Sequence, residues 1–166
     1  MKLILINGQG GTGKTAIASA LKNEITNSAF IEADSLVAVN PFEFDKLGPL
    51  LHKNAVSLIN NFVADGYETI ITAGLTRNQE QLDEFLKVLN LEADIVFVWL
   101  RAHTEVRLNR KQSRNRDGAD SEELFEFMNK IYPDVESFEV KGEKYIDVDT
   151  STKSIQEIVD EIKAGM

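Results

Sequence analysis

The sequence predicts an α/β fold in which a parallel sheet is covered by helices on both faces. Five short apolar runs, rich in β-branched or aromatic residues, are spread along the chain. Segments with helical spacing of apolar residues separate these runs. The runs are almost continuously apolar, which is typical of parallel strands that are buried on both faces. Ligands of such sheets bind at the carboxyl ends of the strands, so the residues after each run are candidate site residues.

The first half of the chain contains two strand patterns and two helix patterns. The first expected strand, residues 3–6, leads through a glycine-rich loop to a helical pattern at residues 16–21. The second strand, residues 29–31, precedes a long helical pattern between residues 47 and 63, which Gly66 ends just past its last turn. Prolines and glycine at positions 41, 48 and 49 predict an irregular start to that helix.

The second half continues the alternation. Strands are expected at residues 69–71, 95–100 and 145–148, with helical patterns at residues 82–89 and after His103. The last helix has an apolar face every three to four residues, and we expect Thr150 and Ser151 to be its cap residues. The 166 residues contain no linker or internal repeat, so we expect a single domain over residues 1–166.

The loop after the first strand has the complete spacing of a phosphate-binding loop, G-x-x-x-x-G-K-[ST]. Its glycines let successive backbone N–H groups point at a phosphate, while the following helix adds the positive end of its dipole. Lys14 is expected to reach the outer phosphates and Thr15 to bind Mg²⁺. The candidate nucleotide-binding residues of this segment are Gly8, Gln9, Gly10, Gly11, Thr12, Gly13, Lys14, Thr15 and Ala16.

Composition narrows the possible partners. With 18 Lys and Arg against 27 Asp and Glu, the chain has a formal net charge of -9, which opposes general attraction to nucleic acid or anionic membranes. It has no cysteine, which excludes disulfides and thiolate chemistry. No apolar stretch is long enough for a secretory signal or a membrane span, so we expect a cytoplasmic enzyme. Its oligomeric state stays open.

Two carboxylates follow the second strand. Asp34 is the candidate base that orients an acceptor hydroxyl and takes its proton, and Glu32 or Asp34 can hold Mg²⁺ through water. Asp34 could instead cap a helix, and Glu32 could form a surface ion pair. After the third strand, Gly74 leaves room for a substrate and Arg77 can bind one of its oxygens, although a cap and turn explain both residues equally well.

Six basic residues lie between positions 101 and 116, and several share one helical face. Such a cluster can neutralise the charge on a transferred phosphoryl group. A solvated helix face or, more weakly, a nucleic-acid patch is the alternative. His52 and His103 have no visible metal-ligand partner and are expected to be structural or surface residues. The cluster is Arg101, Arg107, Arg110, Lys111, Arg114 and Arg116.

Five features follow one another along the chain: the phosphate loop, Asp34, the small residues after the third strand, the arginine-rich segment and residues 145–151. In this order they resemble the P-loop small-molecule kinases, which include the shikimate, gluconate and nucleoside monophosphate kinases. The resemblance implies a five-stranded parallel sheet of order 2-3-1-4-5, with the first strand central, and a lid at about residues 107–125. It implies ATP and Mg²⁺ as cofactors. Arg110 would contact the nucleotide, Arg114 or Arg116 would be the lid arginine, and Asp149, Thr150 and Ser151 would border the adenine.

The chain also departs from these kinases. It has Glu32 with Asp34 where shikimate kinases pair two aspartates, it has only Gly74 after the third strand, and it lacks their substrate-binding arginine. Residues 72–77 are similar to a gluconate kinase loop, which keeps a sugar acid possible. The few cations between Lys22 and Arg77 favour a neutral or cationic small-molecule hydroxyl acceptor.

The expected function is transfer of the γ-phosphoryl group of Mg·ATP to a small-molecule hydroxyl. Lys14, Arg114 and Arg116 would stabilise the transition state, and Asp34 would be the base. The first alternative is a nucleotide-binding ATPase or switch that acts through a protein partner, although no guanine-binding N-K-x-D sequence is present. The second alternative is a kinase of nucleic-acid ends or tRNA.

Overall fold

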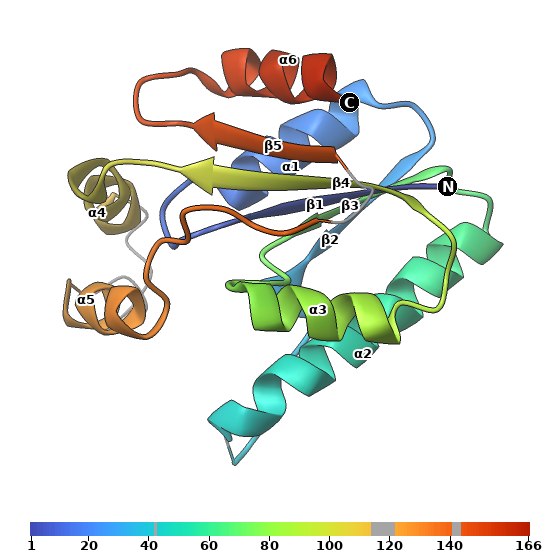
Figure 1. Ribbon diagram of the computed structural model, residues 1–166, viewed down its shortest axis with the longest axis horizontal. Helices are drawn as coiled ribbons and strands as arrows, with labels where there is room; N and C mark the ends of the chain where they lie inside the picture. Colours follow the sequence, from blue (N-terminus) through green and yellow to red (C-terminus); the bar gives the residue numbers. More distant parts are fainter. Residues whose placement is uncertain (42, 114–121, 141–143) are drawn as a thin grey trace.

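The computed structural model describes residues 1–41, 43–113, 122–140 and 144–166, and it contains one five-stranded sheet. The strand order is β2-β3-β1-β4-β5, and all neighbours are parallel, which confirms the expected fold class (Figure 1). Each strand extends the apolar run that predicted it by at least one residue. The strands are β1 (Lys2–Gly8), β2 (Ser28–Glu32), β3 (Thr69–Ala73), β4 (Asp94–Arg101) and β5 (Lys144–Asp149).

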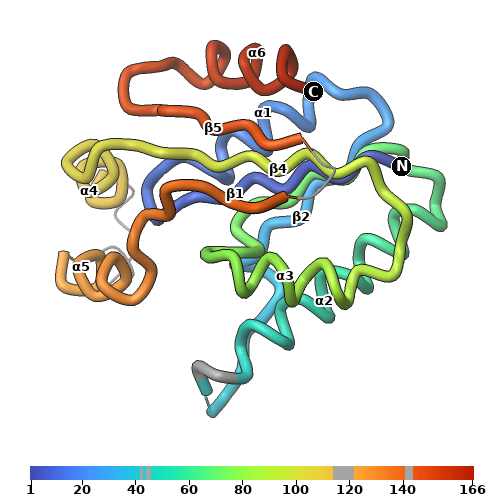
Figure 2. Tube along the Cα trace, in the orientation of Figure 1, coloured from blue at the N-terminus to red at the C-terminus, as the bar shows by residue number. Residues whose placement is uncertain are grey.

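Helices cover both faces of the sheet, as Figure 1 shows. Helices α1 (Lys14–Glu24) and α6 (Ile155–Gly165) pack side by side on one face. Helices α2 (Phe44–Ala64) and α3 (Gln79–Val88) pack together on the other. Helices α4 (Thr104–Gln112) and α5 (Glu122–Ile131) lie beyond the carboxyl end of β4, at one end of the sheet (Figure 2). This end also holds the loop that joins β1 to α1.

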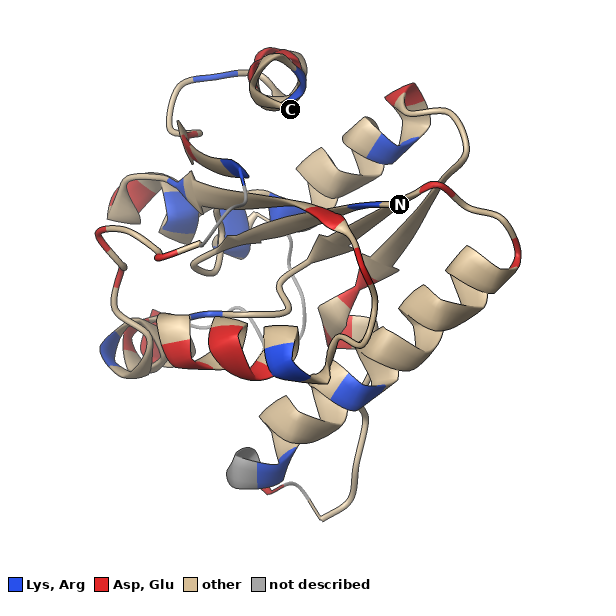
Figure 3. Ribbon diagram, turned by 45° about the vertical axis from the view of Figure 1, so that its right-hand side comes forward, with Lys and Arg blue, Asp and Glu red and all other residues tan. Residues whose placement is uncertain are grey.

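The core has two halves because successive strand side chains point to opposite faces. In β1, Leu3 and Leu5 belong to the cluster shared with α2 and α3, whereas Ile4 and Ile6 belong to the cluster shared with α1 and α6. All four side chains are fully buried. Figure 3 shows that the strands carry few charged residues, which lie mainly on the helices and loops. None of the helices among the described residues is long and apolar enough to cross a bilayer.

The start of α6 differs from the expectation. Thr150 and Ser151 are not its cap residues; Ser154 is, and its hydroxyl accepts the N–H of Glu157 while the Glu157 carboxylate accepts from Ser154. The expected cap residues bond elsewhere, since Thr150 is fully buried beside the phosphate loop and Ser151 bonds to Asp149. A capping box three residues downstream therefore begins the helix.

The start of α2 is also more regular than expected. The helix begins at Phe44, so Gly48 and Pro49 lie inside it, and only Pro41, after a cis peptide bond, lies outside. Pro49 is the sixth helical residue, where the missing N–H removes one bond of the ladder and its fixed φ suits the helix. Packing of the long apolar face against the sheet outweighs that loss.

Candidate active site

The phosphate loop occupies the turn between β1 and α1, and three of its glycines have positive φ. A Cβ on Gly8 would lie 2.4 Å from the carbonyl oxygen of Leu100, so β4 leaves no room for a side chain there. A Cβ on Gly11 (φ 87°) would lie 2.5 Å from the carbonyl oxygen of Arg107 in α4. Gly13 (φ 96°) is the left-handed N-cap of α1. These conformations are accessible to glycine at little cost. The glycine spacing read in the sequence thus matches the backbone geometry that the loop adopts.

Lys14 lies across the mouth of this loop. Its Nζ donates to the carbonyl oxygens of Gly8 and Gln9, both at 2.9 Å. Thr12 closes the loop further, because its hydroxyl donates to the Gln9 carbonyl at 2.9 Å. The ammonium group is thereby held at the edge of the cradle, where an outer phosphate of a nucleotide would meet it.

Thr15 and Glu32 meet at the start of α1. The Thr15 hydroxyl donates to Glu32 Oε1 at 2.8 Å, so the carboxylate at the end of β2 lies beside the expected metal ligand. Hydroxyl and carboxylate oxygens are the hard ligands that Mg²⁺ prefers. The residues present therefore fit Mg²⁺, and Glu32 does not form the surface ion pair that was the alternative, since none is found for it among the described residues.

One cavity of about 330 Å³ brings together residues from five parts of the chain, among them α4 and α5. Lys14 comes from the phosphate loop, Asp34 from a short 3-10 helix (Ala33–Ser35) after β2, and Gly74 and Arg77 from the segment after β3. The Asp34 side chain caps no helix in the described part of the chain, so the capping alternative is not observed. We call this the acceptor cavity; its lining is Gly8, Gln9, Gly10, Lys14, Asp34, Gly74, Arg77, Lys111, Leu124, Phe125, Met128, Asn129 and Tyr132.

The segment after β3 contributes Gly74 and Arg77 to the lining of the acceptor cavity. Gly74 (φ 81°) is needed for its backbone conformation, and a Cβ there would lie 3.4 Å from Lys14 Cε. Arg77 directs its guanidinium over the ring of Tyr132, with 4.8 Å between Cζ and the ring centroid. The helix cap is the next residue, Asn78, whose side chain accepts the N–H of Gln81 at 2.9 Å. Arg77 is therefore not the cap residue; its N–H donates to Gln81 Oε1 at 3.0 Å, and its side chain lines the acceptor cavity.

A second cavity, of about 280 Å³, lies on the other side of the phosphate loop. Arg110 crosses it, donating from Nη1 to the Thr150 hydroxyl at 3.0 Å and from Nη2 to the Thr150 carbonyl at 2.7 Å. The Thr150 hydroxyl in turn lies 3.1 Å from the carbonyl oxygen of Thr12. We call this the nucleoside cavity; its lining is Thr12, Gly13, Ala16, Ile17, Arg110, Ser113, Thr150, Lys153, Ile155 and Ile158.

Asp149 and Ser151 flank Thr150 but do not line the nucleoside cavity. The Asp149 carboxylate accepts from both the hydroxyl and the backbone N–H of Ser151, at 2.6 and 2.8 Å. These hydrogen bonds hold the pKa of Asp149 below its ordinary value. Of the three residues expected to border the adenine, only Thr150 faces the cavity, while the other two stabilise the turn that positions it.

The basic cluster divides into separate environments. Arg101 forms ion pairs with Asp134 and Asp147, and the hydrogen bonds that it donates to Asp147 raise its pKa, so Arg101 is structural. Arg110 faces the nucleoside cavity and Lys111 faces the acceptor cavity. Arg107 is buried against the phosphate loop. Arg114 and Arg116, and the part of the expected lid over 114–121, lie outside the described residues.

Sequence reasoning missed the contribution of α5. Leu124, Phe125, Met128 and Asn129 line the acceptor cavity from this helix, and Tyr132 follows at its end. The apolar spacing of residues 124, 125 and 128 is visible in the sequence and predicts an amphipathic helix. Which surface that helix covers depends on tertiary packing, so the spacing alone did not assign these residues to a site.

Comparison with known families matches residues 4–128 to the family described as AAA domain. No curated protein matches the chain significantly. Solved structures of similar shape include a sugar kinase from Janibacter sp. HTCC2649, with 19% identity over 99% of this chain and 93% of the other, and a TM-score of 0.72. A gluconokinase from Sinorhizobium meliloti 1021 shares 21% identity over 99% and 90%, with a TM-score of 0.71.

A shikimate kinase from Acinetobacter baumannii, solved with shikimate, is 19% identical over 98% of this chain and 91% of the other, with a TM-score of 0.59. At these identities the likeness concerns the fold, which is that of P-loop small-molecule kinases. The family match covers most of the chain, including the phosphate loop, α4 and the start of α5. The chain therefore belongs to the AAA domain family of P-loop proteins.

Proposed function

We propose that this protein is an ATP-dependent kinase that transfers the γ-phosphoryl group of Mg·ATP to a hydroxyl group of a small molecule. One observation carries the proposal: the phosphate loop borders two cavities, with Thr12 and Gly13 lining one, and Lys14 lining the other together with Asp34. A nucleotide in the first cavity would extend its phosphates along the loop toward an acceptor in the second. Membership of a P-loop family, which implies nucleotide binding, supports this arrangement.

The proposed roles follow from the contacts of each residue. Arg110 and Thr150 bind the nucleoside part, and the loop N–H groups and Lys14 bind the phosphates. Asp34 accepts the proton of the acceptor hydroxyl as its oxygen attacks the γ-phosphorus, and the bond from that phosphorus to the ADP oxygen breaks. Lys14, Arg114 and Arg116 stabilise the charge on the transferred group.

Thr15 and Glu32 are proposed to hold Mg²⁺, Thr15 directly and Glu32 through water, with Asp34 as a further candidate through water. When bound, Mg²⁺ neutralises charge on the β- and γ-phosphate oxygens. The hydrogen bond that the Thr15 hydroxyl donates to Glu32 restricts the direction of that hydroxyl group. Glu32 thus fixes the orientation of the one direct protein ligand.

The lining of the acceptor cavity supports a neutral or cationic acceptor. Lys14 and Lys111 both border the phosphate loop, where the nucleotide phosphates would neutralise them. Asp34 carries a negative charge, and Arg77 is engaged with the Tyr132 ring. A sugar acid remains the nearest competitor, since Arg77 could also bind a carboxylate. Strong, specific phosphorylation of gluconate but not of its neutral counterpart glucitol would contradict a neutral or cationic acceptor.

The first experiment is ADP release from Mg·ATP by the purified protein, with and without pooled hydroxyl metabolites. A pool that stimulates release in the wild type, with Lys14→Ala and Asp34→Asn inactive, supports the kinase, and subdividing that pool leads to the substrate. ATP binding without stimulation by any pool favours the ATPase or switch. Salt-sensitive binding of RNA, with labelled phosphate on the RNA end, would favour a nucleic-acid kinase.

A further inference from the structure

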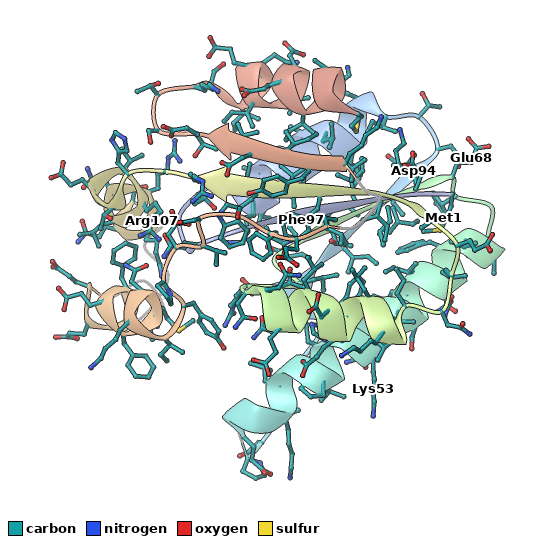
Figure 4. The ribbon with its side chains drawn as sticks, viewed as in Figure 1. Met1, Lys53, Glu68, Asp94, Phe97 and Arg107 are labelled. Carbon is teal, nitrogen blue, oxygen red and sulfur yellow. The ribbon has the colours of Figure 1, made fainter. Side chains whose placement is uncertain are left out.

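Arg107 is a buried arginine that lies between the phosphate loop and α5. Only 3% of the residue is exposed, and Figure 4 shows it in the space between α4 and α5. Its Nη1 donates to the carbonyl oxygen of Gly10 at 3.4 Å and to Asn129 Oδ1 at 3.0 Å. Its guanidinium also lies over the ring of Phe125, with Cζ 5.1 Å from the centroid. One side chain therefore joins the loop to α5.

The charge of Arg107 has no acidic partner within ion-pair distance in the described part of the chain. Its Nε–H, also buried, has no hydrogen-bond acceptor there. Burial lowers the pKa of Arg107, which reflects the cost of desolvating the guanidinium, and the negative charge of Asp134 opposes this shift only in part. The group stays protonated. A buried charge of this kind is costly unless an opposite charge compensates it. The phosphate loop, whose Gly10 carbonyl accepts from Arg107, offers a place beside the guanidinium for a compensating anion.

The geometry of the loop shows how Arg107 acts on that cradle. The backbone of Arg107 packs against Gly11 so closely that a Cβ on Gly11 would lie 2.5 Å from the Arg107 carbonyl oxygen. In the planar trans peptide between Gly10 and Gly11, the carbonyl oxygen and the N–H group point in opposite directions. Holding the Gly10 carbonyl toward Arg107 therefore turns the Gly11 N–H away from Arg107, as a donor for a phosphate on the other side of the loop.

We propose that Arg107 is a positioning residue for the nucleotide phosphates: its hydrogen bond to Gly10 orients the phosphate loop, and its buried charge complements the phosphate anions across that loop. This inference rests on the nucleotide binding in the proposed function, but it does not depend on phosphoryl transfer. The ligand class is a nucleoside diphosphate or triphosphate, and Arg107 acts on its phosphate part alone. Arg110, three residues later, acts on the nucleoside part through the other cavity.

The test compares binding of ADP and adenosine by titration calorimetry. Arg107→Met keeps an unbranched side chain that packs like the aliphatic part of arginine but removes its charge and donors. It weakens ADP binding by about tenfold and changes adenosine binding by less than about twofold, because it removes a charged hydrogen bond on the phosphate side only. Arg107→Lys, which restores the charge and one donor, recovers ADP affinity to within about threefold of the wild type. Arg110→Met is the reciprocal variant and weakens both ligands equally.

Asn129→Ala tests the contact of Arg107 with α5 independently of its contact with the phosphate loop. It removes the contact to the helix but leaves the hydrogen bond to Gly10, so ADP affinity stays within about twofold of the wild type. Equal losses for ADP and adenosine in Arg107→Met would mean a general structural role and would overturn the inference. So would a loss of ADP affinity in Asn129→Ala as large as in Arg107→Met.

Folding of each variant is checked by circular dichroism and thermal unfolding. If Arg107→Met does not fold, Arg107→Lys and Asn129→Ala decide: near-wild-type ADP binding by both supports the inference, and a tenfold loss in Arg107→Lys contradicts it. A wild-type protein that binds ADP but phosphorylates no acceptor would overturn the proposed kinase function and leave the role of Arg107 intact.

Discussion

At the scale of single residues, the candidate active site depends on a few side chains whose partners come from distant parts of the chain. The Thr15 hydroxyl of α1 donates to Glu32, which lies seventeen positions later at the end of β2. His52 of α2 contacts the carbonyl oxygen of Leu75, after β3, at 3.2 Å. The first contact orients the hydroxyl that is proposed to bind Mg²⁺, and the second joins α2 to the segment that lines the acceptor cavity.

Thr15→Val removes the proposed direct ligand of Mg²⁺ while keeping the size of the side chain. In the wild type we expect Mg²⁺ to tighten ATP binding, and in the variant we expect that gain to fall by on the order of tenfold. Calorimetric titration of ATP with Mg²⁺ and with excess chelator measures the difference. An unchanged Mg²⁺ effect in Thr15→Val would exclude Thr15 as the ligand.

The pH dependence of stability reports on His52. This side chain is 2% exposed, and burial holds its pKa below the ordinary value of 6.5. The unfolded chain therefore binds a proton that the folded chain resists, so His52 contributes stability that is present above pH 6.5 and is lost as the pH falls below it. We expect the free energy of unfolding to decrease between pH 7.5 and pH 5.5, measured by urea denaturation.

The matched variant is His52→Gln, whose amide can still donate to the Leu75 carbonyl but does not titrate in this range. Subtracting its pH profile from that of the wild type removes the contribution of groups other than His52. A difference profile without slope below pH 6.5 would show that His52 does not titrate differently on folding.

At the scale of elements, the phosphate loop is shaped by what packs against it. Gly11 and Gly66 have the same φ of 87°, but their surroundings differ. A Cβ on Gly11 would collide with the backbone of Arg107, whereas a Cβ on Gly66 meets nothing within 4 Å. A side chain at Gly66 would therefore introduce backbone strain alone, whereas a side chain at Gly11 would introduce both backbone strain and a steric clash.

Replacing each of these glycines with alanine tests that separation. Gly66→Ala introduces left-handed strain alone, at a cost of about 1–2 kcal/mol. Gly11→Ala adds a forced shift of α4 that costs about 1–3 kcal/mol more. Urea denaturation of both variants measures the free energies of unfolding. Equal losses would show that α4 moves away from the loop without cost.

Helix α2 contains a glycine that packing does not require. Apart from its chain neighbours, a Cβ on Gly48 meets nothing within 4 Å, and its backbone is helical. Gly48 precedes Pro49, and a Cβ before a proline is crowded in the helical conformation. We expect Gly48→Ala to change the free energy of unfolding by less than about 1 kcal/mol, because this crowding offsets the backbone entropy that alanine saves in a helix. The same urea experiment measures it. A gain of about 1 kcal/mol or more would show that Pro49 does not oppose a side chain at this position.

At the scale of the whole molecule, four elements meet at the phosphate loop: β1, β4, α1 and α4. A ligand bound to the loop would hold these elements together. A ligand of that loop should therefore stabilise the entire fold. At 100 times its dissociation constant, ADP would add about 2.7 kcal/mol. For a chain of this size that corresponds to a rise of about 5–10 °C in the unfolding midpoint.

Differential scanning fluorimetry with increasing ADP measures this rise, and Lys14→Ala is the control in which most of it is lost. Adenosine, which lacks phosphates, should produce a smaller shift at the same concentration. Equal shifts from adenosine and ADP, or a full shift in Lys14→Ala, would show that the loop is not the main phosphate site.

The sequence by itself determined the sheet, the phosphate loop and the two strand-end carboxylates, because these features follow from local spacing. Strands reveal themselves by apolar runs, and the loop by glycines at positions where the backbone has positive φ. The carboxylates Glu32 and Asp34 were found because ligands bind at the carboxyl ends of parallel strands. Their separate surroundings, Thr15 for one and the acceptor cavity for the other, were not predictable from their spacing of two.

Only the tertiary structure decided what each basic residue of the cluster does and what covers the acceptor cavity. Arg101, Arg107 and Arg110 have the same chemistry and lie close in sequence, yet one forms ion pairs, one is buried at the loop and one faces the nucleoside cavity. Tertiary structure likewise makes Ser154, rather than Thr150, the cap of α6. Thr150 is buried, and its hydroxyl donates to the carbonyl oxygen of Thr12, 138 positions earlier in the chain. Long-range packing selects among locally equivalent residues, and local spacing carries no information about that choice.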